Sequence, residues 1–329
     1  MAASDLMAKK ALGPATLAVV QAVEAVADAP LLVACSGGPD SLALALAAHI
    51  AAARRGVDVR AAIVDHGLQP GSDTVAATVA EQLAGRGVSA VVLTVTVPDS
   101  PDGTEAAARQ ARYAALEAEA RPDELILLGH TLDDQAETVL LGLARGSGTR
   151  SLAGMPTRRG VFVRPLLGLR AAQTAQACAE LGVEPWRDPH NDEPRFTRVR
   201  VRRQVLPLLE AELGPGIAEA LARTAGLARR DADLLDQLAA DHQLPAVGAP
   251  FAVAELAGLP AAIRGRVLRS WLRAAGATDL SATHLDAVDA LLDDWRGQRW
   301  VELPGVRVSR RGGGLWAESS TPGTFGPQD

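Results

Sequence analysis

The chain has 329 residues and a net charge of −6; 48 % of its residues are hydrophobic and only 3 % are aromatic. This length accommodates one large domain or two ordinary domains, and Ala, Leu and Val must fill their cores. The acidic balance excludes a protein that binds polyanions over its whole surface, so any nucleic acid must contact a local basic patch.

Composition also bounds the compartment. The longest apolar run, residues 42–53, falls short of the roughly 20 residues that a membrane span needs, so no membrane partner is expected. The two cysteines, Cys35 and Cys178, exclude a disulfide framework and a zinc site and favour a reducing cytoplasm. Gln21 and Glu24 interrupt the N-terminal apolar stretch, which predicts an amphipathic helix there rather than a signal peptide.

The first 150 residues alternate short apolar runs with helical patterns. Strands are expected within residues 30–35, 59–68, 88–97 and 123–130, and helices within 39–54, 72–87, 104–120 and 133–145. This alternation predicts an α/β fold, a parallel sheet flanked by helices. Ligands bind beyond the carboxyl ends of such strands, where the polar clusters Ser36–Ser41, Asp65–His66 and His130–Glu137 lie. One composite site is therefore expected.

The pattern changes after Gly146. The stretch "RPLLGLR" predicts a short strand, and a helix follows that ends near Gly182. After the breaker Gly214–Gly216, helices are expected within 217–243, 260–275 and 281–294. A β-hairpin then turns at Pro304–Gly305 or at the later glycine run, before a loose tail. We expect a catalytic domain over 1–213 and a smaller, mainly helical domain with a terminal hairpin over 214–329.

The turn Ser36-Gly37-Gly38-Pro39-Asp40-Ser41 lies between a strand and a buried helix. It lacks the lysine of a Walker A loop and the spacing of a dinucleotide fingerprint. Its backbone N–H groups and the positive helix end can hold a pyrophosphate, which the two glycines allow to approach closely. Asp40 would repel phosphate unless a cation bridges them, which implies Mg²⁺. The alternative is an ordinary capped turn.

Two clusters of charged residues, one acidic and one basic, suggest further binding functions. Asp134 and Glu137 share a helix face and could bind an ammonium group, although Thr131-x-x-Asp134 also resembles a capping box. The other group concentrates five positive charges in nine residues, which predicts contact with RNA phosphates; a solvated helix face is the alternative. This arginine segment contains Arg195, Arg198, Arg200, Arg202 and Arg203.

The Ser36–Ser41 turn resembles the PP-loop of the ATP pyrophosphatases, which cleave ATP into AMP and pyrophosphate. "EAAARQARYAAL", "GHTLDDQAETVLLGLARGSGTRSLAGM", "DPHNDEPRFTRVRVRRQVLP" and "VELPG" are similar to segments of the tRNA(Ile)-lysidine synthetase family, in the family's order. Thr131 and Val199 depart from that pattern, which has a histidine and an asparagine there. A C-terminal module of longer members is also expected to be missing.

The resemblance implies an ATP-dependent ligase that adenylates the wobble cytidine of a tRNA(Ile) with a CAU anticodon; free L-lysine then displaces AMP. The alternatives are another PP-loop ligase acting on a small molecule and a non-catalytic ATP-binding regulator. The oligomeric state stays open, a homodimer included. The implied residues are the Ser36–Ser41 turn with Asp65 and His66 for ATP, Asp40 for Mg²⁺, His130, Asp133, Asp134 and Glu137 for catalysis and lysine, Arg109, Arg112 and Arg145 for phosphate or the leaving group, and the arginine segment for tRNA.

Overall fold

The computed structural model describes residues 12–98, 103–146, 148–188, 193–293, 295–297 and 300–320. The chain divides into two compact units. The first contains Met1–Leu141 and Gly154–Arg223, and the second contains Gly142–Ala153 and Thr224–Asp329. Among the described residues, no helix combines the length and apolar character that crossing a membrane requires.

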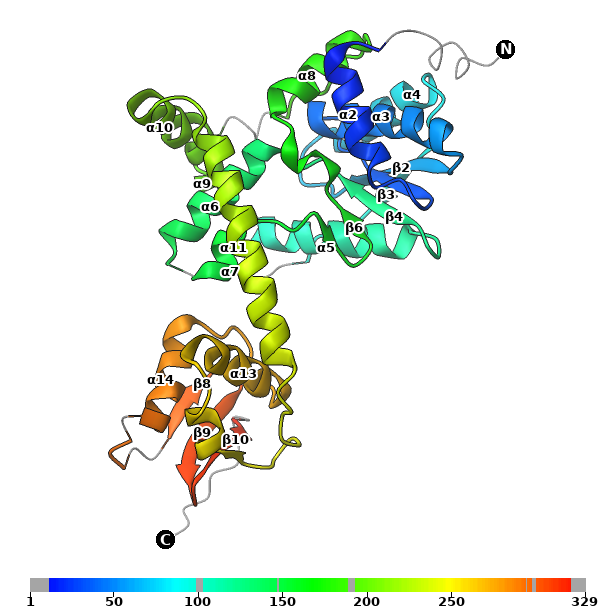
Figure 1. Cartoon of the computed structure of the whole chain (residues 1–329). Helices are drawn as coiled ribbons and strands as arrows, with labels where there is room; N and C mark the ends of the chain where they lie inside the picture. Colours follow the sequence, from blue (N-terminus) through cyan, green and yellow to red (C-terminus); the bar gives the residue numbers. More distant parts are fainter. Residues whose placement is uncertain are drawn as a thin grey trace. The chain divides into compact units, whose positions relative to one another are not determined.

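The first unit is built on a six-stranded sheet with the order β3-β2-β1-β4-β6-β5 (Figure 1). All neighbouring strands pair in parallel except the short edge pair β5–β6, which is antiparallel. The strands are β1 (Leu31–Ala34), β2 (Val59–Asp65), β3 (Ala90–Thr94), β4 (Leu125–Leu128), β5 (Arg158–Arg159) and β6 (Phe162–Val163). The predicted α/β fold is confirmed.

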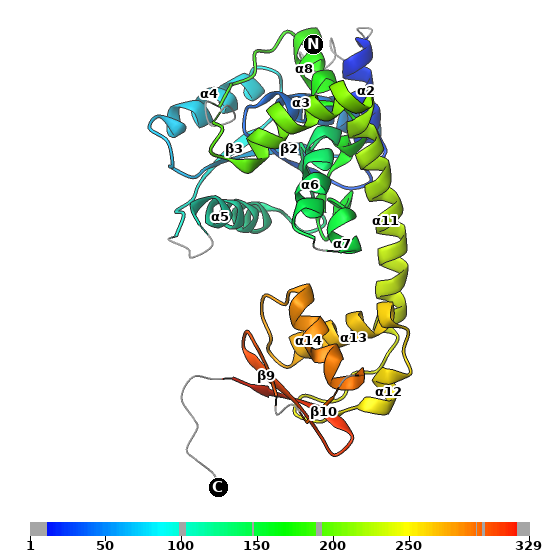
Figure 2. The same ribbon diagram turned by 90° about the vertical axis from the view of Figure 1, so that its left-hand side faces the viewer.

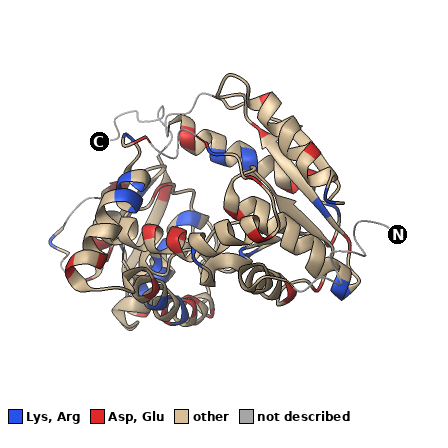
Figure 3. Ribbon diagram, turned by 90° about the horizontal axis from the view of Figure 1, so that it is seen from above, with Lys and Arg blue, Asp and Glu red and all other residues tan. Residues whose placement is uncertain are grey.

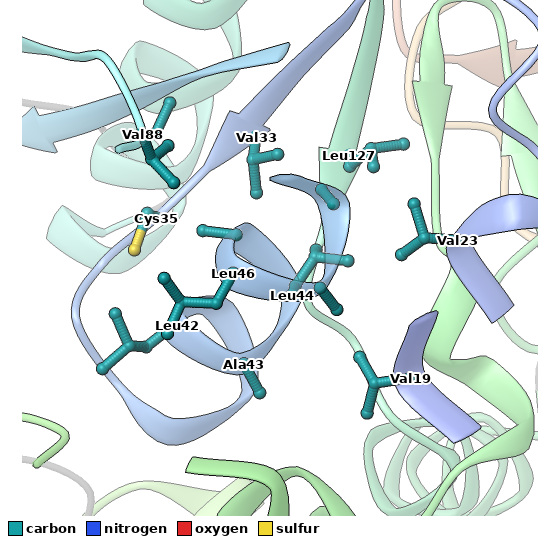
Figure 4. Packing of buried hydrophobic residues seen from close by; sticks show 14 of the residues in the cluster. Val19, Val23, Val33, Cys35, Leu42, Ala43, Leu44, Leu46, Val88 and Leu127 are labelled. Atoms are coloured by element: carbon teal, nitrogen blue, oxygen red, sulfur yellow. The ribbon is translucent and has the colours of Figure 1, made fainter. Parts of the chain in front are cut away.

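Helices cover both faces of this sheet, and each face has its own core (Figures 1 and 2). One core joins alternate residues of β1 and β4, such as Val33 and Leu127, to Leu44 and to Val19 (Figure 4). The other joins the intervening strand residues to Leu116. The helices on the first face are α2 (Pro14–Glu24), α3 (Pro39–Arg55), α4 (Ser72–Ala84) and α8 (Ala171–Glu180); α5 (Thr104–Glu119) covers the other.

The order of the strands locates the ligand-binding edge. Chain order runs outward from β1 through β2 to β3 on one side, and resumes at β4 on the other. Ligands bind at such a reversal point, beyond the carboxyl ends of the strands. The turn after β1 and the turn after β4 flank this point. The latter leads into α6 (Leu132–Ala144).

The stretch "RPLLGLR" was wrongly expected to be a strand. The strand β6 ends at Val163, and residues Pro165–Gly168 form a 3₁₀ turn, η1. Pro165 explains the difference, because it lacks the N–H that a ladder needs and its fixed φ suits the first turn of a helix. Leu166 is fully buried within the core that also contains α3 and α8.

The chain is helical from Thr197 through the rest of the arginine segment, whereas Arg195 lies in the turn before it. It runs through α9 (Thr197–Arg200), the π-helical turn η3 (Val201–Val205) and α10 (Leu206–Leu213). Val201 and Leu206 pack with Leu132 and Ala136 of α6, so the segment lies against that helix. The long helix α11 (Ile217–Ala240) follows.

The second unit joins helices to a four-stranded antiparallel sheet with the order β7-β10-β9-β8. Its core includes Phe251 and Trp271, whose rings meet edge to face with centroids 5.8 Å apart. Both candidate hairpin turns are present, at Pro304–Gly305 and at Gly312–Gly313. The elements are α7 (Thr149–Leu152), β7 (Phe251–Ala252), α12 (Val253–Ala257), α13 (Ala261–Ala274), α14 (Ala282–Asp293), β8 (Val301–Leu303), β9 (Val306–Arg311) and β10 (Gly314–Ser319).

The other helices and strands for which bounds were predicted lie within a few residues of them, and the expected N-terminal helix is present as α2. The short elements α7, α9, α10, α12, β5 and β7 were not predicted. The expected tail from Thr321 lies outside the described residues, as does part of the segment "DPHNDEPRFTRVRVRRQVLP" around His190. The split between 1–213 and 214–329 stays a prediction.

Candidate functional site

The Ser36–Ser41 turn connects β1 to α3 and is held in shape by its own serines. Ser41 Oγ accepts the backbone N–H of Ser36 at 3.1 Å and donates to the carbonyl of Gly38 at 3.1 Å. Gly38 is the extended N-cap residue, and Pro39 begins the helix as predicted. The first N–H groups of a helix have no partner within it, so this preformed turn presents donors to an anion.

Two glycines permit close packing around the turn. Gly37 has a φ of +83°, and a Cβ added there would lie 2.4 Å from Val79 Cγ2. Gly129, directly after β4, would place a Cβ 3.1 Å from backbone atoms of Asp40 and Ser41. The end of β4 therefore touches the first turn of α3, which brings the PP-loop and the start of α6 to one place.

Asp40 lies in the first turn of α3 and accepts a hydrogen bond from Thr174 Oγ1 of α8. Burial raises the pKa of Asp40 to about 6, against the favourable contacts with Thr174 and with the charge of Arg202. The negative charges of Asp134 and Asp133 raise it further. The predicted metal-binding carboxylate and the predicted lysine-binding carboxylate therefore lie within one electrostatic environment.

Asp65 is the last residue of β2, the strand next to the PP-loop strand, and His66 follows it. Asp65 is 8 % exposed and accepts the N–H of Gly67 at 3.0 Å. Hydrogen bonds from Ser72 and Gly67 lower its pKa. Asp65 thus shapes the loop before α4, and contact with ATP stays a prediction for it. Nδ1 of His66 is buried without a hydrogen-bond partner among the described residues.

The first turn of α6 carries two acids with different contacts. Asp134 Oδ2 accepts the N–H of Thr131 at 2.8 Å and its hydroxyl at 3.0 Å, so the acid's half of the predicted capping box is confirmed. Asp133 accepts the N–H of Ala171 at 2.7 Å and pairs with Arg170, which caps the start of α8. Asp133 therefore joins two helices, whereas Asp134 keeps Oδ1 directed toward Arg202.

Glu137 is completely buried one turn further along α6. Arg202 Nε lies 2.5 Å from its Oε1 and Arg198 Nε lies 3.1 Å from its Oε2. Burial raises the pKa of Glu137, while its bond with Arg202 opposes that shift. Two arginines that we predicted to bind tRNA therefore contact the acids that we predicted to bind lysine.

The other arginines of the segment make different contacts. Arg200 donates to the carbonyls of Pro194 and Arg195 at 2.7 and 2.9 Å. Arg195 is exposed, pairs with Glu193 at 2.5 Å and lies over the ring of Phe196. Arg203 is exposed on the π-helical turn. Contact with RNA stays a prediction for all five.

A second cationic group surrounds His130. Burial lowers the pKa of His130 to about 4, and the charges of Arg164, Arg112 and Arg109 contribute in the same direction against Asp134. Arg109 and Arg112 of α5 both lie near the ring of Tyr113. Arg145 follows α6, is exposed and belongs to the second compact unit. Sequence analysis therefore predicted two of the three arginines that lower the pKa of His130, Arg109 and Arg112, but not Arg164.

Arg164, Arg170 and Thr174 were missed. Arg164 is 5 % exposed directly after β6, and its role could not be read because a strand was predicted around it. Thr174 and Arg170 act through Asp40 and Asp133, contacts between segments more than 30 residues apart. Nothing local in the sequence signals such pairs.

Both signs of charge occur together in this site, as they do over the rest of the chain. Figure 3 shows acidic and basic residues interleaved along the helices. Among the described residues, no three His, Cys, Asp or Glu side chains gather closely enough to hold a metal ion without a further ligand. The site instead pairs acids with arginines next to a turn that presents backbone donors.

The chain is similar to known proteins over most of its length. Residues 15–209 match the PP-loop domain family, and residues 251–316 match the TilS substrate binding domain family. A tRNA(Ile)-lysidine synthase of Thermobifida fusca is 53 % identical over 287 residues, covering 85 % of this chain and 89 % of that protein. One of Mycolicibacterium paratuberculosis is 55 % identical over 297 residues, covering 87 % and 90 %.

A solved structure supports the fold alone. A U34-tRNA thiolase from Methanococcus maripaludis aligns with a TM-score of 0.50 and 16 % identity, covering 65 % of this chain and 78 % of that one.

Proposed function

Because this chain belongs to the tRNA(Ile)-lysidine synthase family, we propose that it joins free L-lysine to the wobble cytidine of a tRNA(Ile) with a CAU anticodon. ATP provides the driving force: the cytidine attacks the α-phosphorus, and pyrophosphate leaves. The amine of lysine then displaces AMP from the adenylated cytidine and forms lysidine. The observation that carries this proposal is the contact of Gly129 with Asp40–Ser41, because it joins the phosphate-binding turn to the acids of α6.

The PP-loop supplies the first half of this chemistry. Pyrophosphate needs donors where negative charge develops as it leaves, and fixed backbone N–H groups supply them without reorganisation. The serine bonds that shape the turn and the positive φ of Gly37 hold those groups in place before ATP arrives. His66 and Asp65, at the end of the next strand, are proposed to border the nucleotide.

Asp40 fits a magnesium ion that is shared with ATP. Mg²⁺ is commonly held by one or two carboxylates together with substrate phosphates, rather than by a cage of protein ligands. A buried carboxylate at the phosphate-binding helix end, whose pKa burial raises to about 6, gains most from a cation nearby. When bound, Mg²⁺ would neutralise charge on the departing pyrophosphate.

Asp134 and Glu137 are proposed to receive the lysine side chain. The attacking amine must be neutral, and with a pKa of about 10.4 this costs roughly 4.6 kcal/mol at pH 7. Since burial raises the pKa of Glu137, that carboxylate is suited to accept a proton, whereas Asp134 uses Oδ2 for the cap. Arg198 and Arg202 balance these acids, so an entering ammonium competes with the guanidinium of Arg202.

Two regions are proposed to contact tRNA. In the first unit, these are the members of the arginine segment other than the two that pair with Glu137, namely Arg195, Arg200 and Arg203. The second unit carries arginines over tryptophan rings, a combination that binds phosphate and stacks on exposed bases. These pairs are Arg307 with Trp300, Arg310 with Trp295 and Arg311 with Trp316.

Pyrophosphate release tests the proposal. The protein is incubated with ATP and Mg²⁺, with lysine and tRNA(Ile) bearing CAU each added or omitted, and the RNA is digested to detect lysidine. We expect pyrophosphate only with tRNA, and lysidine only when lysine is also present. Pyrophosphate release with a small substrate and no tRNA would indicate a different PP-loop ligase, and ATP binding without turnover would indicate a regulator.

A further inference from the structure

The face of the first unit's sheet that α5 covers has a cavity of about 530 Å³. Three arginines and one glutamate line it, giving a local net charge of +2 in a chain whose net charge is −6. Its volume lies in the range of ordinary small-ligand sites. Its lining includes Arg109, Tyr113 and Glu117 of α5, Arg159 of β5, Phe162 of β6, and Arg164.

The walls of this cavity combine flat apolar and cationic surfaces. The ring of Tyr113 lies 4.8 Å from that of Phe162, measured between centroids. The guanidinium of Arg109 lies 5.1 Å from the Tyr113 centroid and also donates to its hydroxyl at 3.3 Å. Aromatic rings and guanidinium planes are the surfaces on which proteins stack unpaired bases.

Arg164 supplies a buried charge on one wall. It is 5 % exposed; Nη1 donates to the carbonyl of Pro156 at 3.0 Å and Nη2 to the hydroxyl of Tyr113 at 3.4 Å. Its Nε has no hydrogen-bond partner within the part of the chain that the structure describes. A buried donor of this kind is costly unless an acceptor satisfies it, and an anion would do so.

The cavity adjoins the edge where we place the reaction. The strand β6 pairs in parallel with β4, and Val163 lies opposite Leu127. Arg164 comes directly after β6, at the level of Leu128, the last residue of β4. Arg164 and the start of α6 therefore lie at the same edge of the sheet. A polymer that presents its reacting base at the PP-loop would thus place a neighbouring unit near this cavity.

We propose that this cavity binds one nucleotide of the tRNA anticodon loop, next to the cytidine that reacts. Its phosphate contacts the exposed Arg109 and Arg159, and its base lies against the wall formed by Tyr113 and the guanidiniums. The inference rests on the proposed function for the identity of the RNA. It adds Tyr113, Arg159 and Arg164 to the residues that position the substrate.

Adjacent arginines allow a matched test. Arg159 lines the cavity, whereas Arg158, its exposed neighbour on β5, does not. Binding of tRNA(Ile) and of its isolated anticodon stem-loop is measured by fluorescence anisotropy across a potassium chloride series. Arg159→Ala should weaken binding of both RNAs about tenfold, as expected for a charge-assisted contact. It should lower the salt slope by about 0.7, the value for one phosphate of a single strand.

Tyr113→Leu provides the second arm, since stacking of one base contributes about tenfold or more to affinity. Its salt slope should stay unchanged, and circular dichroism checks its fold. Arg158→Ala should bind within about twofold of the wild type.

Equal effects of Arg158→Ala and Arg159→Ala would overturn the inference. So would weaker ATP binding with unchanged RNA affinity in Arg159→Ala, which would assign the cavity to the free nucleotide. The proposed function fails separately, if the wild-type protein binds the stem-loop yet forms no lysidine.

Discussion

The PP-loop and the arginine segment are both rich in polar groups, but the partners of those groups differ. In the PP-loop, Ser36 and Ser41 satisfy each other and the N–H groups of the helix start remain directed outward. In the arginine segment, Arg198 and Arg202 contact Glu137, and Arg200 contacts carbonyls of its own segment. A site made of backbone is thus preformed, whereas a site made of long side chains holds internal partners that a substrate must replace.

The strongest test of the preformed site is Asp40→Asn. Removing the charge while keeping an acceptor for Thr174 should reduce pyrophosphate release about 10³-fold, as loss of a key electrostatic group does. Because burial raises the pKa of Asp40 to about 6, its ionised form costs stability above that pH, and the neutral variant should melt no lower at pH 7.5. A well-folded variant that retains full activity would contradict the role of Asp40.

Gly37→Ala tests whether backbone shape carries the site. The positive φ and the Cβ position 2.4 Å from Val79 Cγ2 should lower the free energy of unfolding by about 2 to 4 kcal/mol. Gly38→Ala is the matched control, because its φ is −67° and its added Cβ meets only Ser36 Oγ at 3.7 Å. It should change stability by less than about 0.5 kcal/mol. Equal urea midpoints for both variants would remove the steric explanation.

The side-chain site is probed by Glu137→Gln. The neutral amide cannot attract an ammonium or take its proton, so the KM for lysine should rise about tenfold or more while the KM for ATP changes little. Asp133→Asn is the comparison, because Asp133 bonds to Ala171 and Arg170 at the start of α8. It should lower the free energy of unfolding more than it changes the KM for lysine. Equal rises in both KM values for Glu137→Gln would make Glu137 a structural partner of Arg202 alone.

His130 provides a test by pH. Its folded pKa of about 4 lies below the ordinary value of 6.5, so its contribution to stability is present above pH 6.5 and is lost as the pH falls toward 4. At pH 5 the loss amounts to about 2 kcal/mol. Asp40, whose folded pKa is raised, loses stability as the pH rises, which would mask the effect of His130 in the wild type alone. The free energy of unfolding in urea is therefore compared between wild type and His130→Gln at pH 7.5 and at pH 5. A difference that does not change with pH would contradict the burial of a neutral imidazole.

The smallest effect should distinguish members of the arginine segment. Arg200→Ala should lower the salt slope of tRNA binding by about 0.7, since its guanidinium contacts two carbonyls and a hydroxyl within the described part of the chain and can add a phosphate. Arg202→Ala should lower the slope less, because its charge is already paired with Glu137 and Asp134. Identical slopes for the two variants would mean that Arg202 leaves Glu137 and Asp134 completely when RNA binds.

Sequence reading performed best where structure depends on local pattern. The βαβ alternation, the Pro39 helix start and the Asp134 cap follow from spacing and residue type, and each is confirmed. It failed at "RPLLGLR", where apolar character outweighed the effect of Pro165. It could not find the bond from Thr174 to Asp40 or the burial of Arg164, because both depend on which distant segments meet.

Both cysteines contact the PP-loop. Cys178 Sγ donates to the carbonyl of Pro39 at 3.4 Å, and Cys35 Sγ lies 3.8 Å from Ser41 Oγ. Burial raises the pKa of Cys178 to about 11 and raises that of Cys35 as well, so neither thiol forms the reactive thiolate while the loop is closed. Their rate of alkylation therefore measures how often this turn opens, and ATP should slow it. The two native thiols thus report local unfolding at the phosphate-binding turn without an engineered cysteine.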